Sequence, residues 1–253
     1  MMPFKKNNNQ NLTDFGFRKV LAADKDPLVK EVFDSVASKY DIMNDIMSIG
    51  IHRIWKNSLI NMLTPNKYMK LVDVGGGTGD IGSRFLEQGG MNVTVVDINA
   101  KMLHIGKMKS TTNKTFDKIN WVNASAEKLP LPPSYADAYT IAFCIRNVTN
   151  IETVLTEAKR VLKPGGRFLC LEFSQVENQL FKKFYDAYSF SLIPWLGDVI
   201  ASDKKSYKYL AESIRQFPNQ QNFAKIIQAS GLDLVTYRNL SGGIATIHSA
   251  WKI

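Results

Sequence analysis

The chain has 253 residues, of which 45% are hydrophobic and 22% charged, with 32 Lys and Arg residues against 23 Asp and Glu residues. This composition excludes a disordered, collagen-like or disulfide-framework protein, and the two cysteines, Cys144 and Cys170, lack the C-x-x-C spacing of a zinc site. The net charge of +9 is compatible with an anionic ligand, a membrane surface or nucleic acid, and the even spread of basic residues does not choose among them.

The N-terminal part is expected to form a tail and then a helical cover. The first residues are rich in Asn and contain neither an apolar signal core nor an amphipathic presequence, so we interpret residues 1–28 as a tail. Apolar residues at helical spacing predict a helix from Val29 to Tyr40, and a second helix is expected from His52 to Met62. Residues 29–66 precede the first predicted strand and would cover a ligand.

The next segment alternates between strand and helix patterns. Short apolar runs predict strands at Lys70–Val74, Met91–Asp97, Ile119–Val122, Ala138–Phe143 and Arg167–Glu172. Helices are expected at Asp80–Gln88, Ala100–Met108 and Ile151–Leu162. Strands that alternate with helices at this spacing indicate an α/β fold with a doubly wound, mostly parallel sheet. Residues 67–175 would form its cofactor-binding core.

The pattern changes after Ser174. Residues 176–220 are expected to form a helical lid, inserted before the last two strands, and aromatic residues gather in it between Phe181 and Tyr209. Contact with an apolar substrate and ordinary core packing are both compatible with these aromatics. Residues 221–253 are interpreted as closing strands, at Leu232–Tyr237 and Ile244–Trp251, which complete a seven-stranded sheet in a single domain, 1–253.

A glycine-rich stretch stands at the first predicted strand-to-helix junction, with the sequence Asp73-Val-Gly75-Gly-Gly77-Thr78-Gly79-Asp80. Glycines allow a tight turn there and a close approach of a ligand to the backbone. The G-x-G-x-x-G match that begins at Gly77 would suit NAD in an oxidoreductase. Asp73 and Asp80 favour S-adenosylmethionine, because acids oppose a pyrophosphate but suit a cationic cofactor. A purely structural turn is the third interpretation.

Further candidate contacts follow the next strands. Asp97 ends the second predicted strand, where an acid accepts hydrogen bonds from ribose hydroxyls of either cofactor. Asn123 and Ala124 follow the third strand, where a side-chain amide and a backbone N–H can bind an adenine edge. An ordinary polar loop is equally compatible with these two. The K-P-G-G stretch that starts at Lys163 is interpreted as a structural turn before the fifth strand.

The glycine loop, Asp97 and the K-P-G-G turn together resemble class I S-adenosylmethionine-dependent methyltransferases. Narrower motifs resemble the ubiquinone/menaquinone biosynthesis C-methyltransferase family, and this resemblance covers residue 14 to the C-terminus. These motifs are F-D-S-V-A-S-K-Y-D-I-M-N-D from Phe33, S-I-G-I-H-R-I-W-K from Ser48, I-R-N-V-T from Ile145, E-F-S from Glu172, and G-I-A-T-I-H-S-A-W-K from Gly243.

The resemblance implies S-adenosylmethionine-dependent C-methylation of a polyprenylated benzoquinol in ubiquinone biosynthesis, and of demethylmenaquinol in members that serve menaquinone biosynthesis. By position it implies that Thr78, Asp97, Asn123 and Ala124 contact the cofactor. Ala142 stands where the family has a serine, which removes one polar contact. An RNA methyltransferase and a non-catalytic subunit are alternatives, although no basic run or RNA-binding motif supports the first.

Methylation of a quinol ring carbon needs a hydroxyl that is deprotonated or hydrogen-bonded toward phenolate. Arg146 and Asn147 follow the fourth strand, at the edge where ligands of doubly wound folds bind. We expect Arg146 to stabilise the phenolate and Asn147 to orient it. The alternative is a helix-capping or salt-bridged pair.

The proton acceptor is not determined by the sequence. His52 and Tyr40 are candidates from the covering segment, each with a structural role as the alternative. His104 is expected on the surface, and His248 is expected to pack within a closing strand. No metal site is expected.

No stretch reaches the roughly 18 apolar residues of a membrane span, so a prenylated substrate would be reached from the membrane surface. Basic side chains flank the aromatic stretch and would favour peripheral docking on an anionic leaflet, with a solvated face as the alternative. They are Lys182, Lys183, Lys204, Lys205 and Lys208. We expect a cytoplasmic protein peripheral to the inner membrane or, in a eukaryote, a protein of the mitochondrial matrix. A homodimer or a ubiquinone-biosynthesis complex is compatible with this, and nucleic acid is not expected as a partner.

Overall fold

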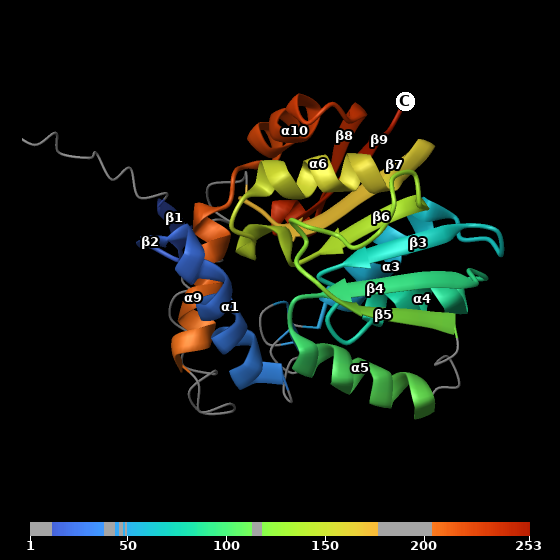
Figure 1. The fold of residues 1–253 in the computed structure, drawn as a ribbon. Coiled ribbons are helices and arrows are strands. Elements are labelled where there is room, and N and C mark those ends of the chain that lie inside the picture. Colours follow the sequence, from blue (N-terminus) through green and yellow to red (C-terminus); the bar gives the residue numbers. More distant parts are fainter. Residues whose placement is uncertain (1–11, 38–43, 46–47, 49, 113–117, 177–203) are drawn as a thin grey trace, which may run out of the picture.

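The computed structural model describes residues 12–37, 44–45, 48, 50–112, 118–176 and 204–253. Its centre is a seven-stranded sheet with the strand order β5-β4-β3-β6-β7-β9-β8 (Figure 1). In chain order the strands are β3 Lys70–Val74, β4 Asn92–Asp97, β5 Ile119–Asn123, β6 Ala136–Ala142, β7 Leu162–Phe173, β8 Asp233–Leu240 and β9 Ala245–Trp251. The predicted α/β class and strand number are confirmed.

The first five strands of this sheet are parallel. Strand β3 pairs with both β4 and β6, β4 pairs with β5, and β6 pairs with β7, whereas β9 is antiparallel to both β7 and β8. The chain therefore runs outward from β3 to β5 and then returns to the other side of β3. Ligands of doubly wound folds bind at the carboxyl ends of the strands beside such a reversal.

Helices cover both faces of the sheet. On one face lie α3 His52–Leu63, α4 Asp80–Glu87 and α5 Ala100–Thr112, and on the other lie α6 Ile151–Val161 and α10 Gln220–Ala229. Strand β3 illustrates why both faces need a cover. Its consecutive residues Leu71 and Val72 point to opposite faces of the sheet, and both are fully buried. A strand buried on both faces needs a continuous apolar run, and such a run had predicted β3 with its observed bounds.

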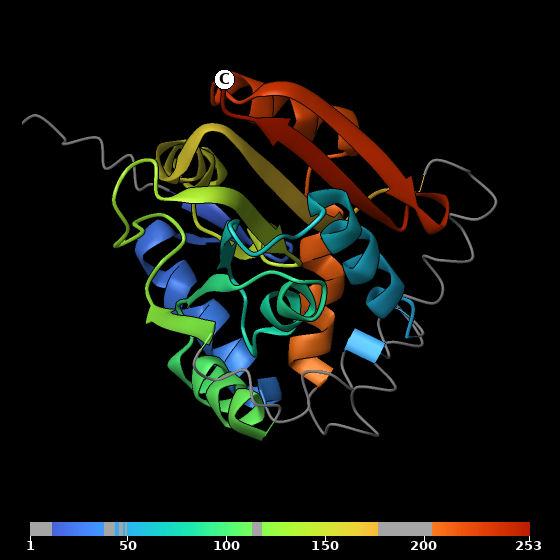
Figure 2. The ribbon, with the colours of Figure 1, turned by 90° about the vertical axis from the view of Figure 1, so that its right-hand side faces the viewer.

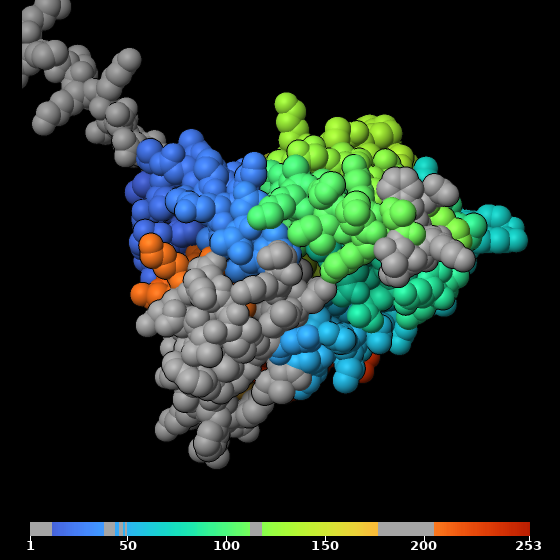
Figure 3. Space-filling model, turned by 90° about the horizontal axis from the view of Figure 1, so that it is seen from below, coloured from blue at the N-terminus to red at the C-terminus, as the bar shows by residue number. Residues whose placement is uncertain are grey.

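A third group of elements lies across the carboxyl ends of the parallel strands (Figures 1 and 2). It consists of the hairpin β1 Leu12–Phe15 and β2 Arg18–Leu21, helix α1 Ala22–Val36 and helix α9 Lys204–Gln216. On the surface, the blue region of α1 adjoins the green region of α5 (Figure 3). Asn99, directly before α5, donates a hydrogen bond to Asp34 of α1. Of the expected cover, residues 29–66, the part of α1 from Val29 lies over the strand ends, whereas α3 packs on one face of the sheet.

The expected tail of residues 1–28 is wrong from Leu12 onward. The hairpin was missed because its strands have four residues each and bury only Phe15, so they show no apolar alternation. Phe15 stacks on Tyr209, at 4.2 Å between ring centroids, a contact that no local pattern reveals. Helix α1 begins at Ala22 rather than Val29 and accommodates Pro27, which cannot donate the usual helical hydrogen bond.

Two further boundaries differ from the expectations. Strand β7 begins at Leu162, so the K-P-G-G stretch is an irregularity within β7 and not a turn before it. Helix α10 lies in the segment that was interpreted as closing strands only. In the expected lid, α9 is helical, while residues 177–203, with most of the aromatic cluster, lie outside the described residues.

Candidate functional site

The glycine loop joins β3 to α4 at the centre of the carboxyl edge. Gly75, Gly77 and Gly79 have φ angles of +62°, +55° and +80°, which residues other than glycine rarely adopt. A Cβ atom on Gly75 would lie 2.1 Å from Cys144 Sγ, and one on Gly79 would lie 2.5 Å from the Trp121 ring. The loop therefore needs glycine both for its backbone and for its packing, and it leaves main-chain atoms uncovered at the strand ends.

Asp97 ends β4 beside this loop. One carboxylate oxygen accepts a hydrogen bond from Gly77 N and the other accepts one from Asn99 N, both at 2.8 Å. Burial raises the pKa of Asp97 to about 6, although both backbone donors act in the opposite direction. A carboxylate oxygen has more than one acceptor direction, so Asp97 can still accept hydrogen bonds from a ligand.

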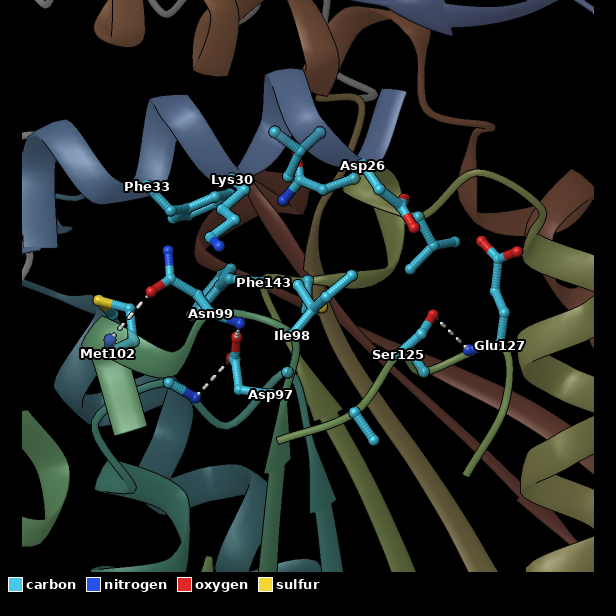
Figure 4. Close-up of a pocket in the computed structure, with 18 residues that line it drawn as sticks. Asp26, Lys30, Phe33, Asp97, Ile98, Asn99, Met102, Ser125, Glu127 and Phe143 are labelled. Carbon is cyan, nitrogen blue, oxygen red and sulfur yellow. Dashed lines mark hydrogen bonds between the residues drawn. The ribbon is translucent and has the colours of Figure 1, made fainter. Parts of the chain in front are cut away.

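A cleft of about 750 Å³, partly open to solvent, lies between α1 and the strand ends (Figure 4). Helix α1 forms its roof with Asp26, Val29, Lys30 and Phe33, whose spacing puts them on one helix face. The remaining lining residues come from the carboxyl ends of β3, β4, β5 and β6 and from the segments that follow them: Gly75, Gly77, Asp97, Ile98, Asn99, Met102, Ala124, Ser125, Ala126, Glu127, Phe143, Cys144, Asn147 and Val148. Elements far apart in the sequence thus enclose one site.

The roof is attached by polar contacts at both ends. Near the start of α1, Lys25 Nζ donates to Val148 O at 2.7 Å, and the Thr149 hydroxyl donates to Asp26 at 2.8 Å. Near its end, Asn99 Nδ2 donates to Asp34 at 2.8 Å. These contacts tie α1 to both sides of the cleft.

Asp73 lies beneath the glycine loop and is fully buried. Its Oδ1 accepts a hydrogen bond from the Thr140 hydroxyl at 2.9 Å, whereas its Oδ2 has no partner among the residues that the structure describes. A Cβ on Gly76 would lie 2.6 Å from this Oδ2, so the carboxylate is pressed against the loop. Burial raises the pKa of Asp73 to about 7.

The predicted cofactor residues are only partly brought together. Gly75, Gly77, Asp97 and Ala124 line the cleft, as expected of a shared site. Asn123 is turned toward the backbone, because its Nδ2 donates to the carbonyls of Asp97 and Ile98. It therefore holds the loop after β4 in place.

Thr78 lines a second hollow, on the other side of the glycine loop, together with His52 and Asp80. Asp80 forms ion pairs with Lys56 and Arg84, each at 2.8 Å. Burial alone would raise the pKa of Asp80, but the two cations hold it below its usual value. The argument that Asp80 would repel an anion at this helix start is therefore wrong, because its charge is already compensated.

The second predicted pair, Arg146 and Asn147, forms the 3₁₀ turn η3 Ile145–Asn147 after β6. Arg146 Nη1 donates to Glu172 Oε1 at 2.6 Å and to Phe143 O at 2.7 Å, and both charged side chains are almost completely buried. The salt-bridged alternative is thus what the structure shows for Arg146, and Glu172 neutralises its charge. Asn147 does line the cleft, and its Nδ2 has no hydrogen-bond partner within the described part of the chain.

Of the two predicted proton acceptors, only His52 is described by the structure, and it does not line the cleft. His52 Nε2 is 2.9 Å from Asp45 Oδ1 in the second hollow, and burial together with Lys56 lowers the pKa of His52. Tyr40 lies outside the described residues. His104 is exposed, and His248 is buried in β9 with Nε2 2.9 Å from Gln220 O, as expected for both.

Sequence reasoning missed several residues that line the cleft, among them Asp26, Lys30, Asn99 and Glu127. Glu127 accepts hydrogen bonds from the backbone N–H groups of Thr149 and Asn150, which joins two cleft loops. For Asn99 a local signal existed, because it accepts a hydrogen bond from Met102 N at the start of α5, as N-cap residues do.

Comparison with known proteins identifies this architecture. Residues 19–252 match the model of the ubiE/COQ5 methyltransferase family, which is nearly the whole chain. The chain belongs to the ubiE/COQ5 methyltransferase family. Among its relatives, a 2-methoxy-6-polyprenyl-1,4-benzoquinol methylase, mitochondrial, of Dictyostelium discoideum is 49% identical, over 98% of this chain and 88% of the relative. A ubiquinone/menaquinone biosynthesis C-methyltransferase of Brucella anthropi is 51% identical, over 94% of this chain and 92% of the relative.

Solved structures share the fold of this family member at low sequence identity. A SAM-dependent methyltransferase from Aquifex aeolicus aligns with a TM-score of 0.60 and 15% identity, over 87% of this chain and 98% of the other. A geranyl diphosphate C-methyltransferase from Streptomyces coelicolor aligns with a TM-score of 0.58 and 14% identity, over 82% of each chain. These similarities confirm the predicted class I methyltransferase fold.

Proposed function

We propose that this methyltransferase transfers a methyl group from S-adenosylmethionine to a ring carbon of a polyprenylated benzoquinol. The observation that carries the proposal is about 50% identity, over nearly the whole chain, to relatives whose names state benzoquinol methylation or ubiquinone biosynthesis. The bacterial names also state menaquinone biosynthesis, so demethylmenaquinol is a second candidate acceptor.

The chemistry of the cleft suits this cofactor. The Asp97 carboxylate can accept hydrogen bonds from ribose hydroxyls, and the main chain at Gly75 and Gly77 is open to the cleft. Asp73 Oδ2, which has no hydrogen-bond partner in the described ranges, puts an uncompensated acceptor under the same loop and favours a cationic ligand. When bound, S-adenosylmethionine supplies a methyl group on a cationic sulfur that is a good leaving group.

The acceptor side of the proposal rests on Asn147. Its Nδ2 can donate a hydrogen bond to the quinol oxygen and so favour the phenolate form, which makes the ring carbon nucleophilic. Arg146 would act from behind the cleft wall, where its ion pair with Glu172 holds the turn that carries Asn147. Val29, Phe33 and Phe143 supply apolar walls that exclude water from the reacting groups.

The proton-accepting roles of His52 and Tyr40 are proposals of the same kind. His52→Ala and Tyr40→Phe should each lower turnover without changing cofactor affinity if the residue accepts the quinol proton. Turnover that stays at the wild-type value would exclude the residue concerned.

Two measurements test the function. Titration calorimetry should give binding of S-adenosylhomocysteine but not of NADH, and the reverse would favour an oxidoreductase. Incubation with S-adenosylmethionine labelled in the methyl group, followed by phase separation, should transfer label to a prenylated benzoquinol in the lipid phase. Label in added RNA would favour an RNA methyltransferase, and binding without turnover on any quinol would favour a non-catalytic subunit.

We also propose a peripheral position at the inner membrane, facing the bacterial cytoplasm or the mitochondrial matrix. None of the described helices is both long and apolar enough to pass through a bilayer. Lys205 and Lys208 on α9 would contribute to binding an anionic leaflet, together with Lys182, Lys183 and Lys204. Vesicles with anionic lipid should sediment the protein at low salt and release it at high salt, and equal binding to neutral vesicles would contradict the electrostatic part. Light scattering after size exclusion tests the proposed homodimer or ubiquinone-biosynthesis complex.

A further inference from the structure

Helix α9 contacts both residues of the turn that carries the proposed acceptor-binding amide. The Tyr209 hydroxyl donates a hydrogen bond to Asn147 Oδ1 at 3.1 Å, and Arg146 Nε donates one to the Ser213 hydroxyl at 3.3 Å. Tyr209 and Ser213 are four residues apart and therefore lie on the same face of α9. One helix face thus contacts both residues of the turn.

The two ends of the Asn147 amide have different surroundings. Its Oδ1 accepts the hydrogen bond from Tyr209, while its Nδ2 is buried and has no partner within the described ranges. A side-chain amide can rotate to exchange its oxygen and nitrogen, and only its hydrogen bonds select one orientation. In the orientation observed, the bond from Tyr209 holds Oδ1, and Nδ2 is the end of the amide that is left for a ligand of the cleft that Asn147 lines.

Tyr209 is itself held in place. Its side chain is 5% exposed, and its ring stacks on Phe15 of the N-terminal hairpin with an angle of 22° between the ring planes. Burial raises the pKa of Tyr209, so the hydroxyl keeps a proton that it can donate to Asn147 Oδ1 at neutral pH. The buried, stacked ring gives this hydroxyl a fixed position beside the amide.

We propose that Tyr209 is a positioning residue, which fixes the Asn147 side chain with Nδ2 available for an oxygen of the quinol acceptor. The inference rests on the proposed function, in which Asn147 orients that acceptor. Tyr209 is not among the described residues that line the cleft, so it acts through Asn147 alone. No local pattern connects Tyr209 with Asn147, because the two residues are 62 positions apart.

The test is a double-mutant cycle with Tyr209→Phe and Asn147→Ala, measured with a prenylated benzoquinol. Tyr209→Phe should lower kcat by about 10-fold and change the affinity for S-adenosylhomocysteine by less than about twofold. On the Asn147→Ala background, Tyr209→Phe should change kcat by less than about twofold, because the group through which it acts is already absent. Losses that simply multiply would overturn the proposal, as would an unchanged kcat in Tyr209→Phe.

Tyr135→Phe is the matched control. It also removes one tyrosine hydroxyl with one side-chain partner, Thr94 at 3.2 Å, but just before β6 begins, at the other end of the sheet from the cleft. Its kcat should stay within about twofold of the wild-type value. A comparable loss in this variant would mean that the Tyr209 effect is a general consequence of destabilisation, and would overturn the proposal.

A measurement without turnover separates this inference from the proposed function. In NMR spectra, the side-chain amide resonances of Asn147 should shift or broaden in Tyr209→Phe and remain unchanged in Tyr135→Phe. Unchanged resonances in Tyr209→Phe would overturn the positioning role even if the enzyme methylates quinols. If the wild-type protein methylates no quinol, the proposed function fails, and these resonances still decide whether Tyr209 fixes the amide.

Discussion

Replacing Arg146 by Leu is expected to destabilise the protein by about 3 to 5 kcal/mol, because the change leaves the Glu172 carboxylate buried without its cation. The two side chains are 3% and 1% exposed, and Arg146 Nη1 lies 2.6 Å from Glu172 Oε1. At an effective dielectric constant of about 20, unit charges about 4 Å apart attract each other by roughly 4 kcal/mol. The desolvation of both ions offsets much of this attraction, so the pair itself contributes little net stability.

This reasoning predicts that the double variant Arg146→Leu/Glu172→Leu is more stable than Arg146→Leu alone. It also predicts a pH dependence. Burial raises the pKa of Glu172 above its ordinary value of 4.5 even beside Arg146, and removal of Arg146 raises the pKa further. Above the ordinary pKa the folded variant then binds more protons than the unfolded chain, so its stability falls as the pH rises.

The assay is urea unfolding followed by circular dichroism, for the wild type, both single variants and the double variant, at about pH 5 and about pH 8. The stability deficit of Arg146→Leu should be smaller at the lower pH, where Glu172 can take up a proton at less cost. A deficit that is equal at both pH values, or single deficits that simply add in the double variant, would refute the buried-charge reasoning.

Four further outcomes are expected. Arg146→Ala should lower turnover by about 10² to 10⁴-fold at nearly unchanged cofactor affinity, because the turn that carries Asn147 loses its ion pair with Glu172, and unchanged turnover would exclude a role for this ion pair. Asp97→Ala should weaken S-adenosylhomocysteine binding by about 10-fold or more in calorimetry, whereas a loss confined to turnover would mean that Asp97 does not hold the ribose. Affinity for S-adenosylmethionine should fall as the pH drops through the pKa values of Asp73, about 7, and Asp97, about 6. The reason is that protonation removes the negative charges that favour a cationic ligand. An affinity that does not change over this pH range would contradict the prediction. Gly75→Ala should lower the free energy of unfolding by more than Gly165→Ala. Both glycines have positive φ, but only at Gly75 would the added Cβ meet a neighbour, Cys144 Sγ. Equal losses of stability in the two variants would refute the packing argument.

The fold could be predicted largely because its central strands, such as β3 and β6, are buried on both faces. Apolar runs such as the one in β3 have only one suitable environment, so their type and bounds follow from the sequence. The N-terminal hairpin has no such signature, because Phe15 is stabilised by Tyr209, nearly two hundred residues later. Contacts between distant segments are not encoded in local periodicity, and this is where the expected tail was wrong.

The site shows the same division. Gly75, Gly77 and Asp97 could be placed from the sequence, because a strand end, a backbone conformation and a side-chain charge are all local properties. The partner of Arg146 could not be predicted, because Glu172 reaches it from the neighbouring strand β7 and reverses the interpretation of its charge. A residue's type indicates what it can do, but its partners determine whether that capacity is free for a ligand.

The way in which α1 is attached has a consequence for how molecules enter and leave. The helix closes the cleft with Val29 and Phe33. Its ends are fastened by a few side-chain hydrogen bonds, which involve Lys25 and Asp26 near its start and Asp34 near its end. Separation of α1 from the strand ends would break these hydrogen bonds and expose apolar side chains such as Val29 and Val36, but it would break no strand pairing. Separation of β3 from its neighbours would unfold the sheet. Amide protons of α1 should accordingly exchange with solvent through partial openings that leave the sheet intact. Bound S-adenosylmethionine should slow this exchange, because contacts with the ligand stabilise the closed position of the helix.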